Sequence, residues 1–123
     1  MARIAYIAQH RRGLPELLKQ LSETGYTVYR LDPNMMAYRQ LRDDPPDMIL
    51  ADMTLRSAHV KELLDALSKS PITRAVALSV LGVAPEEQAA AKAKAPMARE
   101  FHTGPVTRKL LIDIVKRHLA SEA

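Results

Sequence analysis

The regular alternation of short apolar segments with helical stripes constrains the fold of this chain most strongly. Apolar residues recur at i, i+3, i+4 and i+7 after the first apolar segment, which is typical of a helix with one buried face. The same alternation continues to the end of the chain, and it predicts right-handed crossovers between parallel strands. The predicted strands are residues 3–8, 26–31, 48–52, 75–78 and 98–102. The predicted helices begin near Leu14, after a cap at Asp32-Pro33, and near Val60, Ala84 and Val106.

Five strands alternating with five helices predict an α/β flavodoxin-like three-layer sandwich. Its five-stranded parallel sheet is expected to have the order 2-1-3-4-5, with helices on both faces. The length of 123 residues suits one domain, so residues 1–123 are expected to form a single domain. In such sheets, ligands bind in a crevice at the carboxyl ends of the strands. The candidate crevice residues are therefore Ala8, Gln9, His10, Arg11, Asp52, Arg56, Ser79, His102, Gly104 and Pro105.

Composition excludes several classes of protein. There is no cysteine, so disulfides and thiolate metal sites are ruled out, and a reducing compartment is favoured. No apolar stretch is long enough to span a membrane, and the first residues do not form a signal peptide. We therefore expect a soluble, cytoplasmic domain. Met1 lies so close to the first predicted strand that a natural amino terminus is expected there, whereas the carboxyl terminus is undecided.

The net charge of +4 and the pI of about 9.6 favour acidic partners, including nucleic acid. However, the basic residues are scattered along the chain, and only four Tyr and one Phe are available for stacking on bases. A solvated basic surface is the preferred interpretation, and nucleic-acid binding is disfavoured.

Two segments, PDMILADM at residues 46–53 and AVALS at residues 75–79, resemble the CheY-like receiver family of two-component response regulators. PDMILADM, at residues 46–53, resembles the family's third strand, and Asp52 stands in the slot of the phospho-accepting aspartate. AVALS, at residues 75–79, resembles the fourth strand, and Ser79 stands in the slot of the family's Thr or Ser. The resemblance implies the fold predicted above from periodicity.

The carboxyl-terminal part of the chain extends the resemblance over essentially the whole sequence. FHTGPVTRKLLIDIVKRHL, at residues 101–119, resembles the fifth strand, the cis-peptide loop before a proline and the last helix. Phe101 stands in the slot of the family's switch aromatic residue. Ser79 as a plain turn residue and Phe101 as plain core remain open alternatives.

The departures from the family decide the functional prediction. In the family, two acidic residues directly after the first strand hold magnesium together with the phospho-accepting aspartate. Here Ala8 and Gln9 occupy those slots, and shifting the register by one residue gives Gln9 and His10. The family's lysine before the last proline is Gly104. The resemblance therefore implies a degenerate pseudo-receiver with no cofactor.

Phosphoryl transfer to a carboxylate depends on neutralising charge, because an anionic group approaches an anion. Magnesium is commonly fixed by one or two carboxylates, and this site offers Asp52 alone. Without the metal and the lysine, a loss of several orders of magnitude in the rate of phosphorylation is expected. No catalytic residues are predicted, and the chain is not expected to be an enzyme.

A carboxylate without its metal still needs a counter-charge if it is partly buried. We expect Arg11 or Arg56 to pair with Asp52 and to lower its pKa. The alternative is that Asp52 merely caps a loop by accepting hydrogen bonds from nearby N–H groups. A metal site made of Asp52, His10 and His102 is a weaker alternative, and no metal is expected. His118 is expected to interact with the dipole of the last helix.

The preferred function is a phosphorylation-independent signalling or scaffolding module that binds another signalling protein or an output domain. By resemblance, the interface is expected on the face formed by the fourth helix, the fifth strand and the last helix, and a homodimer through the same face is a further option. Ile112 is interpreted either as an exposed anchor or as a residue at the edge of the core. One alternative function is an atypical receiver still phosphorylated at Asp52, and the other is a basic nucleic-acid-binding domain. The predicted interface residues are Glu86, Glu87, Lys92, Arg108, Lys109 and Ile112, around Phe101.

Overall fold

A computed structural model describes residues 2–55 and 58–119 of the chain. Its five strands form one parallel sheet in the order β2-β1-β3-β4-β5, which confirms the predicted fold. The strands are β1 Arg3–Ile7, β2 Thr27–Leu31, β3 Met48–Asp52, β4 Ala77–Val83 and β5 Glu100–Thr103. The helices are α1 Leu14–Ser22, α2 Met35–Asp43, α3 Ala58–Lys69, α4 Gln88–Lys94 and α5 Arg108–Leu119, with 3-10 turns at Thr73–Ala75 and Pro85–Glu87.

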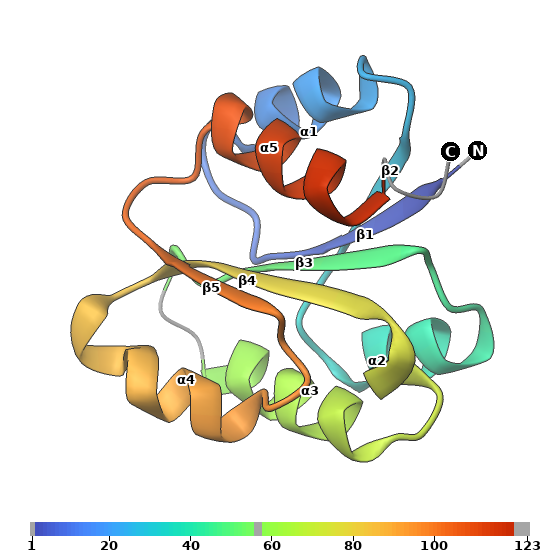
Figure 1. Cartoon of the computed structure of the whole chain (residues 1–123), viewed down its shortest axis with the longest axis vertical. Helices are drawn as coiled ribbons and strands as arrows, with labels where there is room; N and C mark the ends of the chain where they lie inside the picture. Colours follow the sequence, from blue (N-terminus) through green and yellow to red (C-terminus); the bar gives the residue numbers. More distant parts are fainter. Residues whose placement is uncertain (1, 56–57, 120–123) are drawn as a thin grey trace.

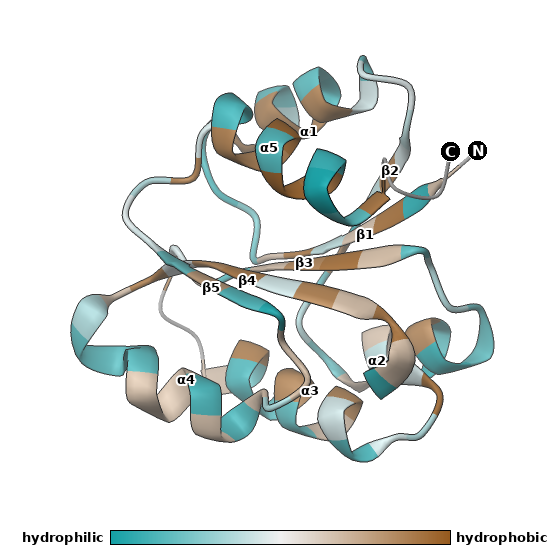
Figure 2. Ribbon diagram, viewed as in Figure 1, coloured by the Kyte–Doolittle hydropathy of each residue, from teal (hydrophilic) through white to brown (hydrophobic). Residues whose placement is uncertain are grey.

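The helices cover both faces of the sheet. Figure 1 shows α1 and α5 on one face and α2, α3 and α4 on the other. Side chains alternate along β3, so Ile49 packs in the cluster beneath α2–α4 and Leu50 packs in the cluster beneath α1 and α5. All five residues of β3 are buried, and the inward sides of the helices in Figure 2 are correspondingly apolar. Asp52 therefore ends the central strand of the sheet, inside the layered core.

The fourth strand differs from the prediction. It begins at Ala77 and continues to Val83, whereas the sequence predicted residues 75–78 with an end at Ser79. A 3-10 turn takes up residues 73–75, and the apolar residues that follow Ser79 pair with β3 as far as Leu81, opposite Asp52. Ser79 consequently lies in the middle of a buried strand, and its prediction as a strand-end residue is wrong.

The second helix begins at a different cap from the predicted one. Asn34 is the N-cap, in extended conformation, and its side chain accepts a hydrogen bond of 2.9 Å from the backbone N–H of Ala37. Asp32 instead pairs with Arg30, with Oδ1 at 2.6 Å from Nη1. The predicted cap at Asp32-Pro33 is therefore wrong by two residues, because the cap must sit directly before the first helical residue.

The carboxyl-terminal elements are shorter than predicted. The helix expected over residues 84–95 begins as a 3-10 turn and becomes α4 only at Gln88, while β5 begins at Glu100 rather than at residue 98. No peptide bond of the described residues is cis, so the bond before Pro105 is trans. Within residues 2–55 and 58–119, no helix combines the length and apolar character needed to cross a membrane.

Candidate functional site

Asp52 lies at the carboxyl end of β3, where the neighbouring strands are β1 and β4. Ala51 pairs with Ile7 of β1, and Asp52 pairs with Leu81 of β4. Because the side chains alternate, the Asp52 carboxylate is on the same side of the sheet as Leu50, toward α1 and α5. Asp52 is 3% exposed, so its carboxylate depends on protein groups rather than water for hydrogen bonds.

Three protein groups satisfy the Asp52 carboxylate. The Tyr6 hydroxyl donates to Oδ2 at 2.5 Å, and the Arg11 guanidinium donates to the same oxygen at 2.7 Å. The backbone N–H of Thr54 donates to Oδ1 at 2.8 Å. The arrangement combines the two predicted roles: Arg11 supplies the counter-charge, as expected, and Thr54 makes the loop-capping contact that was the alternative. Arg56, the other predicted partner, lies outside the described residues.

The electrostatics of this cluster keep Asp52 ionised. Burial raises the pKa of Asp52, but hydrogen bonds from Thr54, Tyr6 and Arg11 outweigh burial and bring the pKa below its ordinary value. Burial and the adjacent Asp52 charge raise the pKa of Tyr6, so the phenol remains a donor at all ordinary pH values. The Asp52–Arg11 pair is thus a charge-assisted contact between a buried carboxylate and a partly exposed guanidinium.

A close backbone approach holds the Thr54 donor in place. Gly82 has φ +65°, and a Cβ atom on it would lie 2.6 Å from Thr54 Oγ1 and 3.0 Å from Thr54 N. The Met53 N–H also donates to the Leu81 carbonyl at 2.8 Å. The end of β4 therefore shapes the loop that caps Asp52, and it needs glycine at position 82.

The residues present do not fit a divalent ion. Magnesium requires several oxygen ligands, commonly including one or two carboxylates. Ala8 and Gln9 follow β1, and both Asp52 oxygens already accept hydrogen bonds from the protein. In the part of the chain that the structure describes, no three His, Asp or Glu side chains are placed to hold a metal. We therefore assign no step at this site to a metal.

The other predicted crevice residues differ in how far they are exposed. Ala8 is buried, Gln9 is half-buried, and His10, Gly104 and Pro105 are exposed.

Two predicted crevice residues have other environments. Ser79 is fully buried opposite Leu50, and its Oγ has no hydrogen-bond partner among the described residues. His102 contacts Glu100 rather than Asp52. The prediction of Ser79 and His102 as crevice residues is therefore wrong, because β4 runs past Ser79 and the His102 side chain faces α5 rather than β3.

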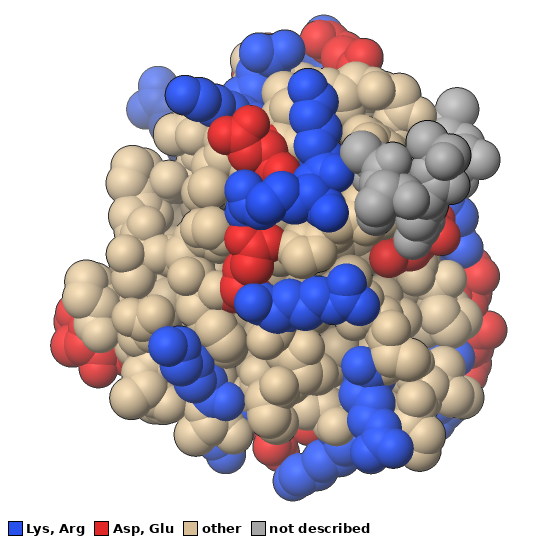
Figure 3. Space-filling view, viewed as in Figure 1, with Lys and Arg blue, Asp and Glu red and all other residues tan. Residues whose placement is uncertain are grey.

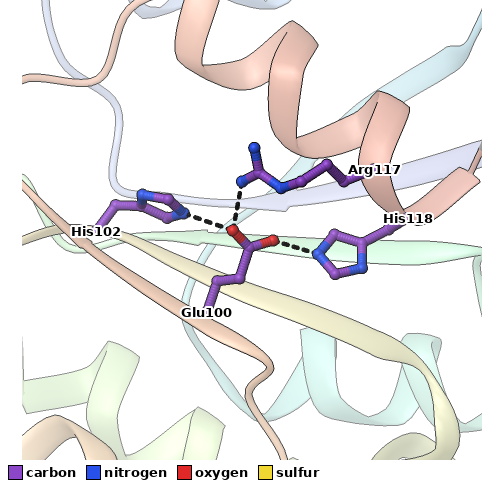
Figure 4. A network of polar contacts seen from close by, with 4 residues as sticks. All are labelled: Glu100, His102, Arg117 and His118. Carbon is purple, nitrogen blue, oxygen red and sulfur yellow. Dashed lines mark hydrogen bonds and ion pairs between the residues drawn. The ribbon is translucent and has the colours of Figure 1, made fainter.

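A polar cluster between β5 and α5 was missed by the sequence reasoning. Glu100 accepts hydrogen bonds from His102 Nε2 at 3.0 Å, from the Arg117 guanidinium and from His118 Nε2 (Figure 4). Burial raises the pKa of Glu100, but His118, Arg117 and His102 together lower it below its ordinary value. His118 therefore contacts a carboxylate, in addition to lying in the last turn of α5, where the dipole interaction was predicted.

Two residues at the Asp52 site also went unpredicted. Tyr6 lies within an apolar strand and gives no periodicity signal, although a buried tyrosine hydroxyl needs a partner and could have prompted a search for one. Thr54 contributes a backbone donor, which sequence patterns do not distinguish.

The predicted interface residues have mixed environments. Arg108 and Lys109 are exposed, whereas Glu87 pairs with Lys61 at 3.2 Å. Ile112 is partly buried and packs against the cluster beneath α1 and α5, which supports its interpretation as an edge-of-core residue.

The aromatic residue of this face is partly buried as well. Phe101 packs against the core beneath α2–α4, and Lys92 Nζ lies 5.8 Å from the centroid of its ring. Glu86 is a further predicted interface residue and follows Pro85 in the 3-10 turn before α4.

Comparisons with known proteins agree on the fold. The sequence matches no protein-family model and no curated protein sequence. Among solved structures, the signal receiver domain of a signal transduction histidine kinase from Syntrophus aciditrophicus is similar with a TM-score of 0.81 and 24% identity, over 98% of this chain and 92% of that one. Vibrio cholerae chemotaxis protein CheY4 is similar with a TM-score of 0.77 and 19% identity, over 97% and 99% of the two chains.

A receiver modulated diguanylate cyclase from Pelobacter carbinolicus is similar with a TM-score of 0.75 and 22% identity, over 99% of this chain and 95% of that chain. The similarity covers nearly the whole of each chain, and the strand order of the sheet is the one predicted. The chain therefore has the fold of CheY-like response-regulator receiver domains.

Proposed function

We propose that the chain is a receiver-type signalling module that works without phosphorylation of Asp52, by binding another protein rather than by catalysis. The observation that supports this proposal is the closed Asp52 carboxylate. It is 3% exposed, and Tyr6, Arg11 and Thr54 donate hydrogen bonds to its two oxygens.

A phosphoryl acceptor needs an accessible oxygen and positive charge aimed at the incoming phosphoryl group. Here Oδ2 would have to lose its contacts with Tyr6 and Arg11 before it could attack phosphorus. Breaking hydrogen bonds to a buried charge costs several kcal/mol, roughly 1–3 for each contact. The acidic pair and the lysine that would offset this cost in a receiver are absent from the sequence positions that correspond to them.

The similar structures suggest the kind of protein in which such a module acts. One is described as the receiver domain of a histidine kinase and another as a receiver modulated diguanylate cyclase. By analogy, the partner of this chain is an output domain or another signalling protein, bound through the α4–β5–α5 face. A homodimer through that face is the alternative assembly.

An amide spectrum tests the proposal directly. The ¹⁵N-labelled protein is recorded alone, with Mg²⁺, and with Mg²⁺ plus beryllium fluoride, an analogue of the phosphoryl group. We expect no shift at Asp52, Met53 or Thr54, because the carboxylate is already occupied. Mass spectrometry after incubation with acetyl phosphate should likewise find no added phosphoryl group.

A variant that opens the site provides the positive control. Gln9→Asp with Arg11→Ala restores one acidic residue and removes the counter-charge, so magnesium affinity should rise. The opposing function is an atypical receiver, favoured by the similar receiver domain of Pseudomonas aeruginosa kinase PA1611, which holds magnesium in its active-site cleft at 18% identity. Magnesium-dependent beryllium fluoride shifts around Asp52 in the unmodified protein would establish that function and exclude ours.

A further inference from the structure

Cationic side chains from α4, from α5 and from the residue before β5 lie along the outer edge of the sheet. β5 is the edge strand, with α4 on one side and α5 on the other (Figure 1). Lys92 of α4 reaches the Phe101 ring, with Nζ 5.8 Å from its centroid, and Arg117 of α5 reaches Glu100. Arg99, directly before β5, is exposed. We call Lys92, Arg99 and Arg117, together with β5, the β5 face.

Figure 3 shows this side of the molecule. Lysine and arginine side chains lie over α5, across the middle of the view and over the lower helices, and acidic side chains lie between the basic ones of the upper half. The acidic residue of β5 is Glu100, whose side chain is 21% exposed. Three donors already surround its carboxylate: His102, Arg117 and His118 (Figure 4). The Glu100 charge is therefore offset within the protein, and the β5 face presents a net positive charge to a partner.

The charge of the β5 face also depends on the protonation of the imidazoles around Glu100. Imidazole is the side chain whose ordinary titration falls between about pH 5 and 8. Two imidazoles, those of His102 and His118, contact one carboxylate, and their side chains are 24% and 14% exposed. The groups that face them are Glu100 on β5 and Arg117 on α5. Each proton taken up by an imidazole adds a positive charge that Glu100, already shared with Arg117, offsets only in part.

We propose that the β5 face is a proton-sensitive docking surface for an acidic protein segment, which binds more tightly when protonation adds positive charge to the cluster of His102, His118 and Arg117 around Glu100. The inference rests on the proposed function, because it names the chemistry and the regulation of the partner surface assigned there. We choose an acidic segment because its charge complements that of the β5 face. Its carboxylates would contact Lys92 and Arg99 at the rim and the cationic cluster beside Glu100.

A protein segment fits this surface better than a nucleic acid does. Proteins that bind single strands combine a basic groove with aromatic side chains on which bases stack. The aromatic side chain of β5 is Phe101, which is half-buried, packs against the core and lies beneath Lys92. β5 is also the edge strand of the sheet, and an extended peptide can add to such an edge by pairing with its backbone.

A glutamate-rich peptide with a fluorescent label is the probe for this surface. Its affinity for the full chain is measured by anisotropy from about pH 8 to about pH 5.5, where imidazoles titrate, without magnesium or phosphodonor. Affinity should rise about three- to tenfold over that range, a change of roughly 1 kcal/mol. Amide shifts caused by the peptide should map to β5 and to the flanking sides of α4 and α5.

Charge-reversal variants locate the surface. Lys92→Glu with Arg99→Glu should weaken the peptide at least about tenfold, or roughly 1.4 kcal/mol. Arg39→Glu with Arg12→Glu makes the same change of charge at exposed positions on α2 and before α1, and it should have a small effect. Equal loss of affinity in the two pairs would show a nonspecific polyanion effect and overturn the proposal.

Histidine variants test the proton dependence separately. His102→Gln with His118→Gln should flatten the pH profile, and its midpoint in the unmodified protein should match the imidazole titration followed by NMR. If the double variant does not fold, His102→Gln alone is used, because His102 is the more exposed of the two histidines. The inference would be contradicted by an unchanged pH profile in the histidine variant, or by an oligonucleotide that binds the β5 face more tightly than the peptide does. A beryllium fluoride response would instead refute the proposed function and leave these binding results intact.

Discussion

At the scale of single residues, three protein donors stabilise the buried carboxylate of Asp52. Tyr6 and Arg11 share Oδ2 of Asp52, while the Thr54 N–H takes Oδ1. The sequence separations are 46 residues for Tyr6 and 41 for Arg11. Arg11 was predictable from its charge and its place after the first strand, whereas Tyr6 was not, because nothing in an apolar strand reveals which face its hydroxyl will reach.

Replacing Arg11 tests the counter-charge. Arg11→Ala leaves Asp52 buried with one fewer donor, so the free energy of unfolding should fall by about 1–3 kcal/mol at pH 7. Urea denaturation measures the change. Arg12→Ala is the matched control, because Arg12 is exposed and has no contact with Asp52 among the described residues. Equal effects of the two substitutions would show that Arg11 contributes no specific interaction.

The titration of Asp52 tests the same cluster from the carboxylate side. Carbon-13 NMR should give a pKa below that of a free aspartate, about 3.9, because hydrogen bonds outweigh burial. The folded carboxyl then binds its proton less readily than the unfolded one. Its stabilisation is present above about pH 4 and is lost as the pH falls through the folded pKa. In Arg11→Ala the pKa should rise, and a pKa that stays the same would contradict the pairing.

At the scale of elements, the end of β4 determines the conformation of the loop that follows Asp52. The strand continues past Ser79, and its pairing with β5 shifts register between Val80 and Val83. Gly82 lies within that irregular stretch and approaches Thr54. The local pattern of the sequence predicts the strand but with an end at Ser79, because its continuation to Val83 depends on pairing with β3.

Adding a methyl group at position 82 should disturb this loop. Gly82→Ala introduces both an unfavourable φ and a Cβ atom 2.6 Å from Thr54 Oγ1. Thermal and urea unfolding should show a loss of about 2–4 kcal/mol. Gly25→Ala has a positive φ of 104° but no atom within 4 Å of the new Cβ, so it should cost only about 1 kcal/mol. If Gly25→Ala cost as much as Gly82→Ala, backbone strain alone would explain both.

The N-cap of α2 is a second feature at this scale. Asn34→Ala removes the acceptor for the Ala37 N–H and should lower stability by about 1 kcal/mol. Asp32→Ala should have a smaller effect, because the exposed Asp32 pairs with Arg30 at the surface. If urea denaturation showed that Asp32→Ala lowers the free energy of unfolding more than Asn34→Ala does, Asp32 would be the cap, as the sequence predicted.

At the scale of the whole molecule, Glu100 connects the edge strand β5 to the last helix α5 through its contacts with Arg117 and His118. Its pKa is lowered because His118, Arg117 and His102 outweigh burial. The stabilisation from this carboxylate is therefore present above the unfolded value of about 4.3 and declines as the pH falls through the folded pKa. Acid should weaken the contact between β5 and α5 in this range.

Glu100→Gln makes that expectation measurable. The variant should be less stable than the unmodified protein near pH 7, and it should lose less stability between about pH 5 and pH 3. Urea denaturation at both ends of the range measures the difference. Glu23→Gln, at an exposed carboxylate, should leave the slope unchanged. A slope in Glu100→Gln as steep as that of the unmodified chain would argue against the cluster.

The sequence alone determined the order of elements, the parallel sheet and the place of Asp52, because apolar periodicity is a local property of the chain. It also placed Ala8 and Gln9 directly after the first strand and Gly104 before the last proline, since the identity of a residue does not depend on folding. The tertiary structure decided which side chains meet. Tyr6 of β1 reaches Asp52 on the adjacent strand β3. Glu100 meets Arg117 and His118 of α5, which follow it by 17 and 18 residues in the sequence. Such contacts depend on strand register and helix rotation, which are set by packing of the whole molecule rather than by any one segment.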